Sequence, residues 1–496
     1  MAGESSAHRT TTALPVWLLL GAAILGMVSL HAHPLLHPWL FDDDFALLTA
    51  SWDWSSTRHY IWVPFDDNVW PLERLTSYLV VNLSGRVTAF PRATSFLGPI
   101  AVSVAMVLVY LFVRREMGHP LYGLVAAIVF GVSLKYNQAV FWYAATFLAV
   151  MLDTLLLALL AAQSWRLTGR KSSLAWCIFW VALAPGWFPS GILAGPLCCL
   201  YLLPRENEHE PAPFSWSRCL KALWPLLGSV AYLGISLPQN LDRLFVVKRV
   251  GGQSLTETFS PLLGLLYTLR SIVDNLVFGV VGASGATCPV WLLPLPLLVI
   301  GLAGWWWWRQ APRRRLMVLG CGLIFLSYWL TLSARAVLPY EGQEHSLHER
   351  NRYNLLPFLG LVLFAGAGLP SRQGTLFQLD PSGRLTRGQV RALAVLLAIL
   401  VGLQFPVSWI GHQRTDYDAA EQMAVLRHIE EVDARCQTNR ISAPTAREAL
   451  GFLEIPLSTT PGSGYPPRIN GWQWLKGSDD PLPYEDLNEV RRLLNP

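Results

Sequence analysis

Hydrophobic stretches recur along the whole chain and are separated by polar segments. Most of them approach the length of about 20 residues that a helix needs to cross a bilayer. The pattern predicts an all-α polytopic membrane protein with about eleven transmembrane helices. We expect the spans at residues 13–30, 95–113, 120–134, 144–162, 173–203 (two short spans), 221–237, 290–308, 316–333, 354–369 and 392–410.

Two hydrophobic segments do not fit a single ordinary span. Residues 173–203 are too long for one, and Pro185–Gly191 interrupts them, which predicts two short spans joined by a turn. Residues 261–282 carry Arg270 and Asp274 four positions apart, a pair that favours the interface over the bilayer centre. We therefore expect residues 261–282 to form an external, partly re-entrant amphipathic helix.

The composition agrees with a membrane protein. Of 496 residues, 52% are hydrophobic and only 14% are charged. Basic residues follow the second and fourth spans, at Arg114, Arg115 and Arg166, which places these loops and the amino terminus in the cytoplasm. The seven cysteines include no CxxC pair, so neither a disulfide framework nor a zinc site is indicated. We expect a multi-pass protein of the plasma or inner membrane or the endoplasmic reticulum.

The arrangement of spans divides the chain into two domains. Residues 1–410 form a transmembrane domain, whose first external loop covers residues 31–94. Within this loop, Glu73–Leu79 is predicted to be a short amphipathic helix on the membrane surface. Residues 411–496 form a small external C-terminal domain, in which Ala419–Val432 alternates apolar and charged residues at helical spacing.

An acidic cluster opens the first external loop. Asp42, Asp43 and Asp44 are consecutive and follow the first span closely. Carboxylates beside a hydrocarbon boundary lose solvation and repel one another, so at least one should have a raised pKa. A base of that kind can deprotonate a hydroxyl group. The alternative is a solvated acidic cap on a loop.

Basic residues on the same predicted side could bind an anion. Arg350 and Arg352, followed by Tyr353, stand immediately before a span, where planar guanidinium groups suit a phosphate or diphosphate. The alternative is that these arginines only fix the depth of the helix in the membrane. Arg243 and Lys248 in another external loop are weaker candidates.

A polar edge lies between the third and fourth spans. Lys135, Gln138 and Trp142 could line a substrate pocket there, although anchoring at the membrane interface would explain them equally well. Asp153 lies inside the fourth span, where a carboxyl group either serves a function or forms a structural hydrogen bond.

This layout resembles the GT-C superfamily of integral membrane glycosyltransferases, in particular the dolichyl-phosphate-mannose protein mannosyltransferases and the bacterial enzymes similar to them. The resemblance is clearest over residues 14–165. It rests on the first span, the acidic residues before Phe45 in the following loop, the amphipathic Pro71–Leu79 segment, the Asn137–Trp142 stretch and, more weakly, Arg352-Tyr353.

The resemblance implies inverting transfer of a sugar from a polyprenyl-phosphate donor on the non-cytoplasmic face. An aspartate would be the general base, Asp43 first, then Asp44 and Asp42, while the external arginines would hold the donor phosphate. The acceptor would be a protein, a lipid or a glycan. The protein would also contact membrane lipids, and no nucleic acid is expected as a partner. Three aspartates replace the Asp-Glu pair of the protein mannosyltransferases. Gln138 stands where many bacterial relatives carry a glutamate. A divalent metal is therefore possible, but the resemblance does not require one.

Two other functions compete with this interpretation. A polytopic transporter or flippase of a lipid-linked or anionic substrate would explain the interrupted helix at Pro185–Gly191 and the intramembrane Asp153. A non-catalytic scaffold would explain the C-terminal domain but leaves the acidic cluster without a role. The charges crowd on one predicted face and no internal repeat is visible, which favours the enzyme.

Overall fold

The computed structural model describes most of the chain as helices. The described residues are 14–40, 42–63, 69–203, 216–245, 259–278, 290–311, 313–335, 351–368, 385–413, 416–453, 471–478, 480–483 and 486–494. Within these ranges the only β-type pairing is one isolated bridge, between Ser442 and Gly477, and no strand is formed. The predicted all-α class is therefore confirmed for the described part of the chain.

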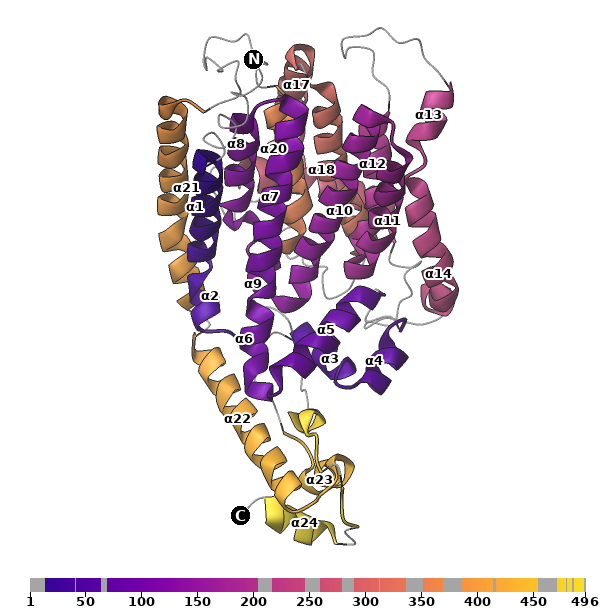
Figure 1. The fold of residues 1–496 in the computed structure, drawn as a ribbon, viewed down its shortest axis with the longest axis vertical. Coiled ribbons are helices and arrows are strands. Elements are labelled where there is room, and N and C mark those ends of the chain that lie inside the picture. The colour runs from indigo at the N-terminus through magenta and orange to yellow at the C-terminus, as the bar shows by residue number, and fades with distance from the viewer. Residues whose placement is uncertain are drawn as a thin grey trace, which may run out of the picture.

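The helices of the predicted spans run roughly along the longest axis of the molecule (Figure 1). Each predicted span contains a helix, and the turn predicted within residues 173–203 falls at Phe188. These helices are α1 Leu14–Leu30, α7 Leu97–Met117, α8 Pro120–Gly131, α10 Tyr143–Thr168, α11 Lys171–Trp187, α12 Ala194–Leu202, α14 Leu226–Phe245, α17 Pro294–Gln310, α18 Arg314–Arg335, α20 Leu355–Ala367 and α21 Arg387–Gln413.

Four described segments are long and apolar enough to cross a bilayer. They are Val87–Met117, Tyr143–Thr168, Arg314–Ser333 and Arg387–Pro406. Five other apolar helices in the described ranges have 10 to 17 residues, below the usual spanning length. The molecule is thus compatible with a membrane protein, while the number of about eleven spans stays a prediction.

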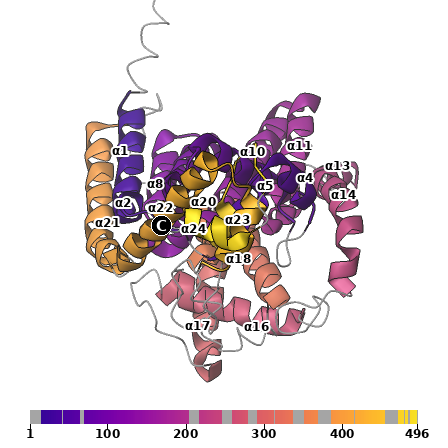
Figure 2. The same ribbon diagram turned by 90° about the horizontal axis from the view of Figure 1, so that it is seen from below.

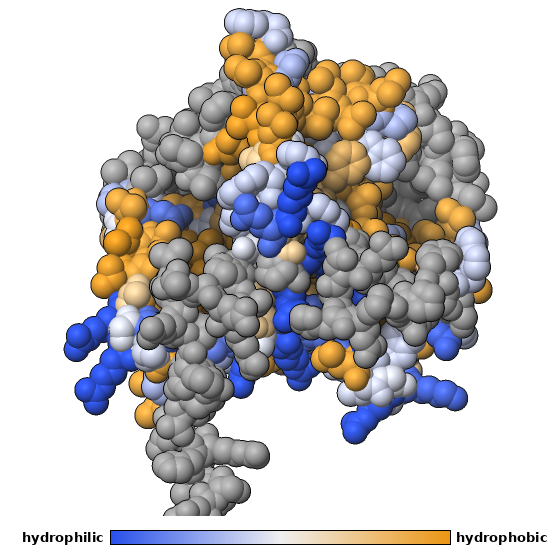
Figure 3. Space-filling model, turned by 90° about the horizontal axis from the view of Figure 1, so that it is seen from above, coloured by the Kyte–Doolittle hydropathy of each residue, from blue (hydrophilic) through white to orange (hydrophobic). Residues whose placement is uncertain are grey.

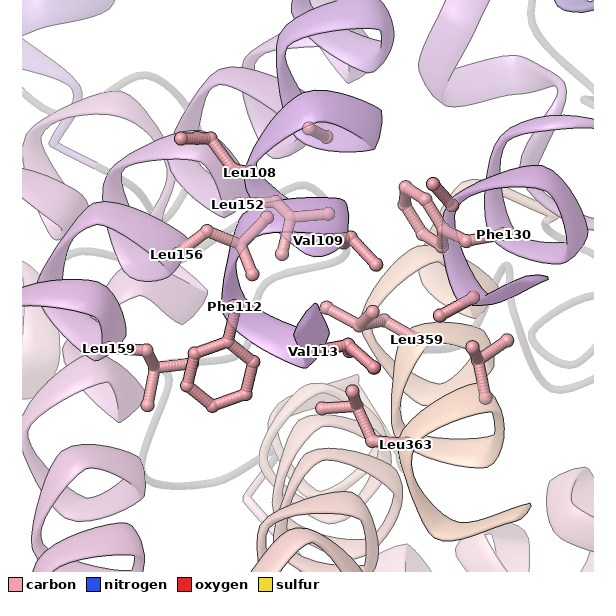
Figure 4. Close-up of a cluster of buried hydrophobic side chains, with 14 of the residues drawn as sticks. Leu108, Val109, Phe112, Val113, Phe130, Leu152, Leu156, Leu159, Leu359 and Leu363 are labelled. Carbon is pink, nitrogen blue, oxygen red and sulfur yellow. The ribbon is translucent and has the colours of Figure 1, made fainter. Parts of the chain in front are cut away.

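The core of the bundle lies where α7, α8, α10 and α20 meet (Figure 4). Aliphatic and phenylalanine side chains interdigitate there without polar atoms, and their burial excludes water from the centre of the bundle. The labelled residues are Leu108, Val109, Phe112 and Val113 of α7, Phe130 of α8, Leu152, Leu156 and Leu159 of α10, and Leu359 and Leu363 of α20.

Helices α14, α17 and α21 lie at the periphery of the bundle (Figure 2). They expose large apolar side chains, and α17 has no buried residue. A helix of this kind is stable where lipid covers its outer face. Exposed examples are Leu227, Val230 and Ile235 of α14, Leu298, Leu302 and Trp305 of α17, and Val395, Ile399 and Leu403 of α21.

The segment predicted to be re-entrant forms α16 (Pro261–Ser271) and a π-helical turn, Ile272–Phe278. It packs on the end of α18, where the amide of Ser260 donates to the carbonyl of Ser333 at 3.0 Å. Arg270 and Asp274 form a buried ion pair, with 3.4 Å between Nε and Oδ2. The segment is outside the four helices with spanning length, and its re-entrant placement stays a prediction.

Basic side chains gather at one end of the bundle. Figure 3 looks onto that end, where hydrophilic side chains lie beside apolar ones. The basic residues come from helix ends that meet there: Arg114 and Arg115 of α7, Arg166 of α10, Lys171 of α11, Arg309 of α17 and Arg314 of α18.

The opposite end carries the short helices of the first loop and the C-terminal domain (Figure 1). Seen from below, the C-terminal helices lie across the end of the bundle (Figure 2). The loop helices are α2 Ala32–Leu36, α3 Asp42–Ala50, α4 Trp54–Tyr60, α5 Pro71–Ser84 and α6 Phe90–Ser95, and the C-terminal helices are α22 Asp416–Thr438, α23 Ala443–Leu450 and α24 Leu487–Leu494.

Candidate functional site

The acidic cluster forms the first turn of α3. Asp42 begins the helix, and carboxylates in a first turn interact favourably with the partial positive charge of the helix amino terminus. Asp43 is half-buried, whereas Asp44 is fully buried and its Oδ1 accepts a hydrogen bond of 2.8 Å from the amide of Ala144. Asp44 therefore anchors α3 to the start of α10, and Asp43 is the more accessible carboxyl group.

Helix α5 places further charged groups beside α3. Glu73 and Arg74 are buried, and Arg74 Nη1 donates to the carbonyl of Leu47 in α3 at 3.4 Å. The Ser77 hydroxyl donates to Glu73 and lies 2.8 Å from the Tyr143 hydroxyl. Buried polar groups that bond to one another in this way fix the position of α5 against α3 and α10.

The carboxyl group of Glu73 has an unusual environment. Burial raises its pKa from 4.5 to about 7, although Arg74 and the hydrogen bond from Ser77 both act in the opposite direction. The Arg74 Nε lies 3.6 Å from Glu73 Oε2. Desolvation outweighs the ion pair here because both groups have lost contact with water.

The sequence predicted a helix in this region but not the burial of its polar face. Glu73 and Ser77 are four positions apart and share one side of α5, which faces the protein, while Leu79 and Leu83 are exposed. In a water-soluble protein the apolar side would face inward. The i, i+4 spacing of Glu73 and Ser77 was the available signal, and its meaning depended on which side meets lipid.

The predicted polar edge lies in the segment just before α10. Lys135 belongs to a 3-10 turn, Gln138 begins the short helix α9 (Gln138–Phe141), and Trp142 links α9 to α10. Burial lowers the pKa of Lys135. Trp142 packs against a hydrophobic cluster formed by Leu47 of α3, Trp70 and Ala144.

Arg352 comes to the same polar edge from a distant part of the chain. Its guanidinium carbon lies 4.2 Å from the ring centre of Trp142 and 5.0 Å from that of Tyr353. Its backbone amide donates to Gln138 Oε1 at 3.4 Å. The cation–π contacts hold the guanidinium group over the indole of Trp142.

Neighbouring polar residues hold the Arg352 turn in place. Asn354 Nδ2 donates to the carbonyl of Lys135 at 3.1 Å, and the Tyr328 hydroxyl of α18 donates to Asn354 Oδ1 at 2.6 Å. These bonds join residues 351–354 to α18 and to the 3-10 turn Leu134–Tyr136, so the position of Arg352 depends on how these elements pack.

The structure thus brings Asp44, Lys135, Gln138, Trp142, Arg352 and Tyr353 to one end of the molecule. Trp142 is the common neighbour of α3, through the Leu47 cluster, and of Arg352. Arg243 belongs to α14, but its side chain is outside the description. Arg350 and Lys248 lie outside the described residues.

The site combines the carboxyl groups of α3 with the cation of Arg352, which lies at Trp142. Carboxyl groups of α3 can accept a proton, and Arg352 can stabilise a phosphate anion. No group of three or more His, Cys, Asp or Glu residues suited to a metal ion is found in the described ranges.

Asp153 was the remaining polar candidate. It lies in α10, and its Oδ1 is buried without a hydrogen-bond partner in the described part of the chain. The structural hydrogen bond considered for this carboxyl group is therefore absent at that oxygen.

No protein-family model matches the chain, and no curated protein matches it significantly in sequence.

Proposed function

We propose that the protein is a membrane glycosyltransferase that transfers a sugar from a polyprenyl-phosphate donor to an acceptor hydroxyl, with inversion at the anomeric carbon. The observation that carries the proposal is the position of Trp142, which packs against the Leu47 cluster at α3 and also stacks with Arg352. Trp142 therefore connects α3, which carries the proposed base, with Arg352, the proposed phosphate-binding cation, so that both can act on one substrate.

Asp43 is the general base in this proposal. It is half-buried in the first turn of α3, whereas the neighbouring carboxyl group of Asp44 is bonded to the backbone of α10. Asp43 removes the proton of the acceptor hydroxyl as its oxygen attacks the anomeric carbon. The bond between that carbon and the phosphate oxygen breaks, and the polyprenyl phosphate leaves with the electron pair.

Arg352 stabilises the charge that develops on the departing phosphate. The leaving group is an anion of low basicity, so it needs cationic stabilisation and no proton donor. Stacking on Trp142 and Tyr353 positions the guanidinium group before substrate binds, which avoids reorganisation during the reaction. Lys135 and Gln138 lie next to Arg352 and would contact the sugar or its phosphate.

The basic end of the bundle supports the sidedness of this proposal. Arginine and lysine residues are enriched on the cytoplasmic side of membrane proteins. With Arg114, Arg166 and Arg314 in the cytoplasm, the α3 end of the bundle is external. The polyprenyl chain of the donor would then remain in the bilayer and present its headgroup to Asp43 and Arg352.

A transporter or flippase is the second candidate. The observation in its favour is Asp153, whose Oδ1 is buried within α10 and unpaired among the described residues. In that case substitution of Asp153 would abolish substrate movement across the membrane, and substitution of Asp43 would not.

The Asp43→Asn variant tests the enzyme directly. The protein is reconstituted in lipid nanodiscs with a series of polyprenyl-phosphate-linked sugars, and release of polyprenyl phosphate is measured. We expect Asp43→Asn to lower kcat by a factor on the order of 10² to 10⁴, the usual contribution of a general base. Glu448→Gln removes an exposed carboxylate of α23 and serves as the control. Full activity in all three single aspartate variants would refute the proposal.

The same assay tests the role of Arg352. Arg352→Ala should raise the donor KM at least tenfold, because a buried cation–phosphate contact is lost. Arg114→Ala is the matched control. Arg114 also lies over a tyrosine ring, that of Tyr110, but it is at the basic end of the bundle, away from Arg352. A donor KM that is unchanged in Arg352→Ala would contradict the phosphate role.

A further inference from the structure

Trp474 of the C-terminal domain is buried against the helix that carries the acidic cluster. Its side chain is 1% exposed, and its ring lies 4.9 Å from that of Phe45, nearly parallel to it at 13°. Phe45 directly follows Asp44 in α3. The contact therefore joins the last part of the chain to the first turn of α3.

The indole of Trp474 makes two further contacts that fix its orientation. Its Nε1 donates to the Thr49 hydroxyl of α3 at 2.8 Å. Its ring meets that of Phe90 edge-on, with the centres 5.5 Å apart. Trp474 therefore contacts α3 near both of its ends, and it also packs against α6 through Phe90.

A second residue of the C-terminal domain holds the chain just before α3. Gln422 of α22 is buried, its Oε1 accepts from the amide of Leu40 at 2.8 Å, and its Nε2 donates to the carbonyl of Leu40 at 2.9 Å. A side-chain amide that satisfies both backbone groups of one buried residue fixes that residue closely. Leu40 lies two residues before the start of α3.

Helix α3 needs such support because it is short. It has 9 residues, below the length of about 12 to 15 residues at which an isolated helix becomes even marginally stable in water. Its three leading aspartates also repel one another. Tertiary contacts must supply the order that the helix cannot supply by itself.

We infer that the C-terminal domain is part of the acidic site, and that Trp474 and Gln422 are positioning residues that set the orientation of Asp43. The catalytic consequence rests on the proposed transferase function, whereas the ordering of α3 does not. Neither residue contacts substrate; both act through α3.

The test compares three variants by hydrogen exchange and kinetics. Trp474→Ala removes the ring stack and the hydrogen bond, whereas Thr49→Val removes only the hydrogen bond from the α3 side. Trp472→Phe is the control, because Trp472 belongs to the same turn, Gly471–Trp474, but contacts His428 of α22. Amide exchange is followed in residues 42–50 and, as an internal reference, in residues 120–131 of α8, which belongs to the core of the bundle.

We expect exchange in α3 to be at least tenfold faster in Trp474→Ala and severalfold faster in Thr49→Val, with α8 unchanged. At saturating donor, kcat should fall tenfold or more in Trp474→Ala, while the donor KM stays within about threefold, since Arg352 is not disturbed. A residue that only stabilised the fold as a whole would loosen α8 together with α3.

Two results would overturn the inference. The first is wild-type exchange in α3 when Trp474 is replaced. The second is a loosened α3 with an unchanged kcat. If Trp474→Ala fails to fold, Thr49→Val decides by the same criteria. Absence of sugar transfer by the wild-type protein would instead refute the transferase proposal, and the exchange data would still decide whether the C-terminal domain orders α3.

Discussion

Glu73 shows how one buried residue links the candidate site to stability. The burial of its carboxyl group raises its pKa from 4.5 to about 7. The folded protein therefore binds a proton between these pH values that the unfolded chain releases. Stability that depends on this proton is present at low pH and is lost as the pH rises through the window from 4.5 to about 7.

The Glu73→Gln variant tests this linkage. Glutamine has the shape of the protonated acid and does not ionise, so the variant should gain stability relative to the wild type as the pH rises. We expect equal free energies of unfolding near pH 4.5 and a higher one for Glu73→Gln at pH 8, by an amount on the order of 3 kcal/mol, measured by thermal unfolding. Glu448→Gln controls for loss of an exposed charge. A difference between variant and wild type that does not change with pH would contradict the raised pKa.

At the scale of elements, glycines determine how closely two central helices approach. A Cβ atom on Gly360 of α20 would come within 2.6 Å of the carbonyl oxygen of Gly320 in α18, and a Cβ on Gly320 would meet the carbonyl oxygen of Gly360 at 2.5 Å. Backbones in such proximity gain dispersion contacts along the whole interface, which is how helices associate in lipid. Arg352 lies in the 3-10 turn Asn351–Asn354 that leads into α20, so the position of α20 also determines where Arg352 lies.

Gly360→Ala should therefore separate α18 from α20. We expect a loss of about 1 to 3 kcal/mol from overpacking, seen as a lower melting temperature, together with weaker donor binding through Arg352. Gly366→Ala is a matched control on the same helix, since no atom lies within 4 Å of a Cβ there. Equal melting temperatures for the two variants would show that the helices can move apart without cost.

At the scale of the whole molecule, the two ends of the bundle differ in charge and in what covers them. One end collects basic residues from α7, α10, α17 and α18, and the other carries α3, α5 and the C-terminal domain. Because charges inside a bilayer are costly, we expect the two ends to lie at the two boundaries of the apolar region.

Reporter fusions can determine which end is cytoplasmic. Alkaline phosphatase needs disulfide bonds and is active only outside the bacterial cytoplasm. We expect activity when it is fused behind the C-terminal domain, and none when it is fused after Arg170, between α10 and α11. Reversed activities would place Asp43 and Arg352 in the cytoplasm and exclude an external donor.

Several site residues could be predicted because they are close in sequence or lie at helix ends. Asp43 and Asp44 follow the first apolar span closely, and Gln138 and Trp142 mark a turn between apolar stretches. That the aspartates begin a helix, α3, was not predicted. Glu73 was not predicted as part of the site, since its burial against α3 depends on the packing of α5. The approach of Arg352 to Trp142 joins residues about 200 positions apart, and local pattern carries no information on such pairs.

The sequence by itself determined the helical class, the positions of the apolar segments and the acidic cluster after the first of them, because these follow from hydropathy and local chemistry. Only the tertiary structure decided which polar residues meet. Hydrophobic periodicity specifies that a face is buried but not which partner buries it. Trp474 on Phe45, Gln422 on Leu40 and Arg352 on Trp142 therefore became apparent only in the folded chain.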